Sequence, residues 1–120
     1  MARLLTPAGE ARSRLEAAEG LSMDWLVDDS LVENAGLTVA RMTLARGART
    51  QRHRHPNCSE VIHLIEGRVD HAIGQERVAM KAGDTVFIPA GCYHQTTNIG
   101  GRDATMIVSY SAGTRIYEAE

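Results

Sequence analysis

Aromatic residues are scarce in this 120-residue chain, and charge of either sign shows no excess. One tryptophan, one phenylalanine and three tyrosines make up 4% of the chain, which is too few for a platform on which bases stack. Thirteen basic residues stand against fifteen acidic ones, so no strongly basic surface indicates nucleic-acid binding. We therefore expect a small-molecule ligand and no nucleic-acid partner.

Long apolar runs and cysteines are also few. No stretch approaches the roughly 18 consecutive apolar residues that cross a membrane, and the first residues lack the apolar core of a signal peptide. Cys58 and Cys92 are too few for a disulfide framework, so we expect two reduced thiols, with a redox pair as the alternative. These absences predict a cytoplasmic protein without a membrane partner. The length and the 43% hydrophobic content fit a single core.

The first of two spaced motifs contains two histidines and a glutamate. It runs from Gly47 through His53, His55 and Glu60 to Gly67. Because successive side chains of a β-strand alternate between its faces, His53 and His55 are expected to point the same way, about 6.6 Å apart. Two imidazoles at that spacing can converge on one metal ion. Glu60 begins a further β-favourable run, which Gly67 ends.

The second motif adds a third histidine on another predicted strand. It contains Gly83, Pro89, Gly91, His94 and Asn98, so the histidine follows a turn. Three imidazoles and one carboxylate form a mixed set suited to one divalent transition metal ion: iron, manganese, nickel, copper, cobalt or zinc. One or two coordination positions remain for water or substrate, which indicates chemistry rather than structural support.

Both motifs resemble, at every fixed position and gap, the two sequence signatures of the cupin superfamily. The resemblance implies an all-β fold, the double-stranded β-helix or jelly-roll barrel, in a small single-domain cupin. It also implies that His53, His55, Glu60 and His94 bind one metal ion per chain. For the function, it implies a metal-dependent protein acting on a small oxygenated or carboxylated metabolite.

The type of reaction stays open at this point, because one fold hosts many functions. Dioxygenase chemistry is the first hypothesis, since it is frequent among short cupins with this ligand set. Isomerase, lyase and decarboxylase chemistries are alternatives within the enzymes. A binding or sensing module that holds a metal or metabolite without turnover is the alternative from another class.

Short β-favourable runs separated by glycine and proline fill residues 31–120, which we take as the barrel domain. Within it, Gly74-Gln75 predicts a hairpin turn between residues 69–73 and 77–80. Residues 1–30 are expected to form an N-terminal extension. A short helix is predicted there from Pro7 to Glu19, with the proline in its first turn.

A half-buried strand is predicted to follow this helix, with Met23, Trp25 and Val27 on one face. If this strand lay at the edge of the sheet, a monomer would expose a large aromatic ring and an unpaired backbone edge. We therefore expect a homodimer through this strand, as the resemblance to small cupins also implies. Packing of Trp25 on its own barrel is the alternative.

Three further residues are candidates for catalytic roles. Gln51 shares the strand parity of His53, so it either binds substrate or a metal-bound water, or bonds to backbone at the start of the strand. His71 lies on an otherwise apolar face and is either a general acid or base, or a satisfied core residue. Tyr93 precedes His94, and either its hydroxyl contacts a bound oxyanion or its ring shields the mouth of the barrel.

Overall fold

The computed structural model describes residues 4–8, 12–15 and 19–120, which form eleven strands. In chain order these strands are β1 (Arg12–Leu15), β2 (Leu21–Val27), β3 (Thr38–Leu44), β4 (His53–Arg54), β5 (Glu60–Glu66), β6 (Arg68–Ile73), β7 (Glu76–Lys81), β8 (Thr85–Ile88), β9 (His94–Asn98), β10 (Ala104–Tyr110) and β11 (Glu118–Ala119). Within the described ranges, no helix has the length and apolar character needed to cross a membrane.

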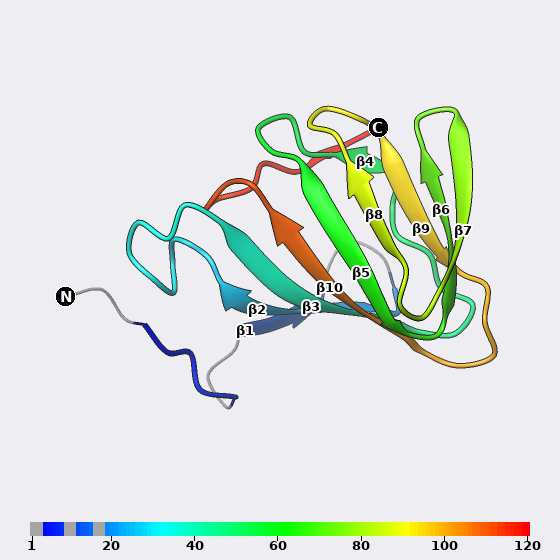
Figure 1. The fold of residues 1–120 in the computed structure, drawn as a ribbon, viewed down its shortest axis with the longest axis horizontal. Coiled ribbons are helices and arrows are strands. Elements are labelled where there is room, and N and C mark those ends of the chain that lie inside the picture. Colours follow the sequence, from blue (N-terminus) through cyan, green and yellow to red (C-terminus); the bar gives the residue numbers. More distant parts are fainter. Residues whose placement is uncertain (1–3, 9–11, 16–18) are drawn as a thin grey trace.

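The strands form two antiparallel sheets that make the walls of a barrel (Figure 1). One sheet has six strands in the order β1-β2-β3-β10-β5-β8, and the other has five in the order β11-β4-β9-β6-β7. From β3 to β6 and from β7 to β11, each strand lies in the opposite sheet from the strand before it. This crossing between sheets is the jelly-roll arrangement, so the predicted all-β fold is confirmed.

The interior of the barrel is filled by alternate residues of its central strands. Ile62 and Leu64 of β5 and Met106 and Val108 of β10 are all fully buried. Burying one such side chain stabilises the fold by about 1.5 to 3 kcal/mol. The residues between them face outward, because strand side chains alternate between faces. The period of two therefore decides which side chains reach the interior.

The predicted hairpin at Gly74-Gln75 is confirmed. It joins β6 to β7, whose last pair across the strands is Ile73 with Glu76. Gly74 has a φ of +58°, a conformation that glycine adopts without a Cβ clash. β6 begins one residue earlier than the sequence indicated, and β7 extends one residue further at each end.

The N-terminal extension differs from the prediction in one element. Residues Arg12–Leu15 form strand β1, paired antiparallel with β2, so the helix predicted from Pro7 to Glu19 is wrong there. Residues 9–11 and 16–18 of that prediction lie outside the described residues. The physical reason is long-range: β1 pairs with backbone N–H and C=O groups that β2 would otherwise leave open at a sheet edge.

The predicted strand that contains Trp25 is confirmed, but the strand is not an edge. β2 lies between β1 and β3, and Trp25 is only 4% exposed. The guanidinium of Arg115 lies 4.7 Å from the centroid of the indole ring. The argument for a homodimer through an exposed Trp25 is therefore wrong, because the chain covers this ring and this edge itself. The homodimer remains a prediction without that support.

Candidate metal centre

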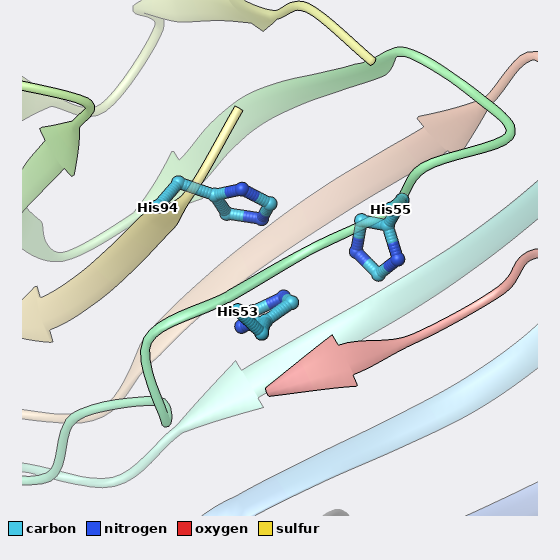
Figure 2. Close-up of side chains that lie close together, drawn as sticks. All are labelled: His53, His55 and His94. Atoms are coloured by element: carbon cyan, nitrogen blue, oxygen red, sulfur yellow. The ribbon is translucent and has the colours of Figure 1, made fainter. Parts of the chain in front are cut away.

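Three histidines of the two motifs lie together, with their rings turned toward one another (Figure 2). His53 begins β4 and His94 begins β9, and these two residues face each other across the paired strands. His55 follows β4 on the same segment of chain. Each ring offers a nitrogen that lies within 4.8 Å of the nitrogens of the other two. The three histidines are therefore close enough to hold one metal ion.

A turn connects the two motifs in space. Gly91 has a φ of +78°, which favours glycine, and its N–H donates to the carbonyl of His55 at 3.0 Å. This hydrogen bond fixes His55 of the first motif against the turn that leads to His94. The spacing between turn and histidine thus determines where the third imidazole enters the site.

Glu60 brings a carboxylate to the same place from the other sheet. It begins β5, is 4% exposed, and its Oε1 lies 3.1 Å from Nε2 of His94. The same oxygen lies 3.5 Å from Nε2 of His55. The carboxylate therefore lies beside two of the three imidazoles. Its role as a fourth ligand remains a prediction.

A backbone carbonyl holds each of the three imidazoles through its Nδ1 atom. The partners are Gln51 for His53 at 2.6 Å, Ile116 for His55 at 2.8 Å, and Cys92 for His94 at 3.0 Å. A carbonyl oxygen only accepts hydrogen bonds, so each Nδ1 carries the proton and donates it. In the neutral rings the lone pair then lies on Nε2, the nitrogen free to bind a metal.

Three buried polar atoms in this cluster have no hydrogen-bond partner: Nε2 of His55, Nε2 of His94 and Oε1 of Glu60. With the imidazole proton on Nδ1 and the carboxylate ionised, all three atoms can only accept hydrogen bonds. The short distances from Oε1 of Glu60 to the two Nε2 atoms are therefore not hydrogen bonds. An unsatisfied buried polar atom costs about 1 to 3 kcal/mol. A cation among them would satisfy all three, and imidazole nitrogen with carboxylate oxygen suits divalent transition metals. The residues present therefore fit the implied ion.

Burial also sets the charges of this cluster. Loss of solvation, together with the nearby His94, lowers the pKa of His53 to about 4. Burial lowers the pKa of His55 as well, against the opposing effect of Glu60. For Glu60 itself, burial would raise the pKa, but the surrounding histidines outweigh it and the pKa is lowered. These shifts keep His53 and His55 neutral and Glu60 anionic near pH 7, which are the forms that bind metal.

His71 lies inside the barrel, as its strand parity predicted. It is 0% exposed, and its ring centroid lies 6.2 Å from that of His94. Its Nε2 and Nδ1 atoms lie 3.1 and 3.4 Å from the hydroxyl of Thr96, the residue opposite it on β9. Burial lowers the pKa of His71 to about 4, so the ring is neutral near pH 7. A role as general acid or base remains a prediction.

Gln51 and Tyr93 do not join the three imidazoles. Gln51 is exposed, and its Oε1 accepts a hydrogen bond from the hydroxyl of Tyr117 at 2.8 Å. The inward orientation predicted for it is wrong, because parity holds only within a strand and β4 begins two residues later. Tyr93 is half-buried, with the guanidinium of Arg54 at 4.8 Å from its ring centroid.

Tyr93 packs against Arg54 of β4. Arg54 follows His53 within that strand, so its side chain points away from the imidazole, and its guanidinium lies over the ring of Tyr93. This placement argues against the predicted contact of the Tyr93 hydroxyl with a bound oxyanion. The alternative, a ring that shields the mouth of the barrel, remains a prediction.

Two residues near the site carried no signal in the sequence. The ring of Tyr117 stacks on that of His53, with centroids 4.6 Å apart and an angle of 18° between the planes. Its neighbour Ile116 supplies the carbonyl that orients His55. Both lie beyond the second motif and reach the site only because β11 pairs with β4. No spacing rule within the motifs could have indicated them.

Comparison with known proteins agrees with this fold. A family model described as a cupin domain matches residues 40–110. A germin-like protein of Morus alba is 34% identical over 86 residues, which cover 68% of this chain and 41% of that protein. Oxalate oxidase GF-2.8 of Triticum aestivum is 28% identical over 115 residues, covering 89% of this chain and 47% of that protein. The chain thus spans about half the length of these relatives.

Solved structures resemble the chain at lower identity. Oxalate oxidase in complex with the substrate analogue glycolate aligns with a TM-score of 0.80 and 21% identity, over 95% of this chain and 61% of the other. The oxalate decarboxylase of Lactobacillus farciminis in its formate complex aligns with a TM-score of 0.83 and 16% identity, over 92% of this chain and 34% of the other. At these identities, the likeness shows a shared fold.

Proposed function

Since this chain belongs to the cupin domain family, we propose that it is a metal-dependent enzyme acting on a small oxygenated or carboxylated metabolite. One observation carries the proposal: nitrogens of three imidazoles lie within 4.8 Å of one another, and the Nε2 atoms of two of them lie 3.1 and 3.5 Å from a buried carboxylate oxygen. Such a cluster is costly to bury without a cation, because its acceptors face one another unpaired.

A divalent ion held by His53, His55, His94 and Glu60 would supply positive charge and an open position for a substrate oxygen. The residues of the chain provide the rest. The carboxylate of Glu60 offsets one unit of the charge of the ion, and the backbone carbonyls fix the planes of the imidazoles. Within the barrel, His71 and Thr96 form the polar pair that would orient a bound substrate.

The carboxylated class of substrates is supported by the named relatives. The relative that aligns with 89% of this chain is an oxalate oxidase, whose name specifies a small dicarboxylate and an oxidation. We therefore take oxygen-dependent oxidation of a small carboxylate, in keeping with the dioxygenase hypothesis, as the first reaction to test. Isomerase, lyase and decarboxylase reactions on the same class of compound are the alternatives.

The test begins with metal analysis of purified, untagged protein, followed by reconstitution with each of the candidate ions. Oxygen consumption and product formation are then measured with a panel of small mono- and dicarboxylates, oxalate included. We expect about one metal ion per chain and turnover of at least one carboxylate. His53→Ala/His94→Ala is the negative control, and full metal occupancy in this variant would contradict the site.

Glu60→Gln sharpens the assignment of the carboxylate. Because it removes the one anionic group but leaves three imidazoles, we expect this variant to keep more metal than the histidine variants. The same change raises the net charge of the site, so turnover should fall severely. Unchanged turnover in Glu60→Gln would show that the glutamate does not bind the ion.

A metal- or metabolite-binding protein without turnover is the second candidate. The observation that favours it is burial: His55, Glu60 and His94 are only 2 to 4% exposed, and Tyr117 covers His53. A site this enclosed holds an ion well but restricts the entry of a substrate. In that case a carboxylate would raise the melting temperature of the metal-loaded protein, with no product formed under any ion.

A further inference from the structure

The segment of residues 115–120 runs along the metal centre, and we call it the covering segment. Its strand β11 passes beside His53, and Ala119 is the cross-strand partner of that histidine (Figure 2). Two ion pairs join the segment to the first motif: Glu118 with Arg54 at 2.5 Å and Glu120 with Arg52 at 2.8 Å. The covering segment therefore lies against the side of the site formed by β4.

Tyr117 is the residue of the covering segment that contacts a predicted ligand with its side chain. Its ring lies nearly parallel to the imidazole of His53, and its hydroxyl donates to Oε1 of Gln51. The backbone carbonyl of Gln51 in turn accepts from Nδ1 of His53. Tyr117 and Gln51 thus hold the same imidazole, one by stacking on its face and one at its edge.

The position of this contact matters because His53 is the most open of the three histidines. His55 and His94 are each 2% exposed, whereas His53 is half-buried. Tyr117 is 37% exposed, so its ring stands between His53 and solvent. The guanidinium of Arg115 lies 5.7 Å from the centroid of the same ring, which gives the ring a second contact within the segment.

We propose that Tyr117 is a positioning residue that orients His53 and limits the size of the anion that reaches the metal ion. The inference rests on the proposed function, because it requires that the three histidines hold a metal. An aromatic ring stacked on the most open ligand keeps this imidazole in one orientation and narrows the approach from solvent. Small carboxylates then enter, and aromatic or branched ones are excluded.

The variants are chosen to separate the ring from the hydroxyl. Tyr117→Ala removes both, and Tyr117→Phe keeps the ring that stacks on His53 while losing the hydrogen bond to Gln51. Phe87→Ala is the matched control, since it removes an aromatic ring that is 60% exposed on β8, in the other sheet. Circular dichroism and thermal melting establish that each variant is folded before the other measurements.

The first measurement needs no metal. Diethyl pyrocarbonate modifies neutral imidazoles, and peptide mass spectrometry compares the modification rate of His53 with that of His63, which is exposed on the outer face of β5. We expect Tyr117→Ala to raise the ratio of the His53 rate to the His63 rate by up to about tenfold. Loss of the free energy of one aromatic stacking contact changes a rate by about this factor. Tyr117→Phe and Phe87→Ala should leave the ratio at the wild-type value.

The second measurement uses Co²⁺ as the metal and acetate or benzoate as the anion, followed by the visible spectrum of the ion. In the wild type, acetate should perturb the spectrum and benzoate should not. Tyr117→Ala should respond to both anions and should lose Co²⁺ to a chelator up to about ten times faster. Tyr117→Phe should restore the wild-type response, because the ring provides the barrier.

The outcomes separate this inference from the proposed function. Wild-type protein that binds Co²⁺ while Tyr117→Ala keeps the wild-type anion range and modification ratio overturns the inference alone. A wild type that binds no Co²⁺ overturns the proposed function, and the inference falls with it. Faster loss of Co²⁺ without a change in the benzoate response would contradict the size limit, because a merely structural role predicts that result.

Discussion

Two strands that follow one another in the chain, β9 and β10, bury side chains of opposite character: polar in β9 and mostly apolar in β10. The buried residues of β9 are His94, Thr96 and Asn98, whereas those of β10 are Ala104, Met106, Val108 and Tyr110. The two strands lie in different sheets of the same barrel. Strand β10 thus provides apolar burial, and strand β9 provides polar groups in a place from which water is excluded.

The polar residues of β9 differ in how well they are satisfied. The amide of Asn98 donates to the carbonyls of Leu44 and Arg102, and the hydroxyl of Thr96 lies within hydrogen-bonding distance of His71. Nε2 of His94 has no such partner. A buried polar side chain whose hydrogen bonds are made within the chain stabilises the fold. A buried side chain whose polar atom has no partner in the chain is available to bind a ligand.

The largest expected effect is on metal binding, which depends on the buried polar residues. His94→Ala should reduce the metal content from about one ion per chain to near zero, measured by elemental analysis of untagged protein, because it removes one of three converging imidazoles. The metal-free form should lose less stability than a large core truncation would cause, since no satisfied hydrogen bond of Nε2 is lost. His63→Ala, on the exposed face of β5, is the control and should retain the metal.

The apolar side should respond in the opposite way. Leu64→Ala should lower the free energy of unfolding by about 2 to 5 kcal/mol, because it opens a cavity at a side chain that is fully buried. Urea titration measures this change. The folded fraction should still bind one metal ion per chain. Loss of metal binding in folded Leu64→Ala protein would show that the apolar core and the metal site do not act independently.

Removal of the metal should weaken the barrel without unfolding it. The apolar core is independent of the site, so the chelated protein should still melt in one cooperative transition. An ion present at a hundred times its dissociation constant would add about 2.7 kcal/mol, so chelation should lower the melting temperature by several degrees. Calorimetry with and without chelator checks this. A chelated protein with no cooperative transition would mean that the site is needed for folding.

The smallest expected effect is the pH dependence of the metal-free protein. The folded-state pKa of His71 is about 4, below its usual 6.5, so the unfolded chain binds more protons between these values. The free energy of unfolding should therefore be highest above about pH 6.5 and fall as the pH drops toward 4. Urea titrations across this range should show a shallower dependence in His71→Gln than in the wild type. Equal slopes would contradict the assignment, and His63→Gln serves as the control.

The ligand cluster was predictable because its determinants are local. His53 and His55 are two residues apart, and strand alternation places them on one side without any knowledge of the rest of the fold. His94 follows a turn that Pro89 and Gly91 indicate directly. Glu60 lies in the first motif, five residues after His55, and the match of both motifs to a family pattern then linked this group to the distant His94. The hairpin at Gly74 was accessible for the same local reason.

The failures share a long-range cause. The residues of β1 were assigned to a helix because the available backbone of β2, with which they pair, is not visible in local sequence. Gln51 was placed inward by extending a strand two residues past its start. The sequence favours an exposed Trp25 and offers packing on its own barrel as the alternative; the structure shows the alternative, with Arg115, ninety positions away, over the ring. In each case a contact between distant segments decided the outcome.

The sequence by itself determined the period-two pattern of the strands, the turns and the identity of the three imidazoles, because these depend on residues only a few positions apart. Only the tertiary structure decided the orientation of His55, since the carbonyl that accepts from its Nδ1 belongs to Ile116, sixty-one positions away, whereas Gln51 and Cys92 lie only two positions from the histidines they hold. It also decided that Tyr117 covers His53. Pairing between β4 and β11 brings residues about sixty positions apart into contact, and no local propensity encodes a meeting over that distance.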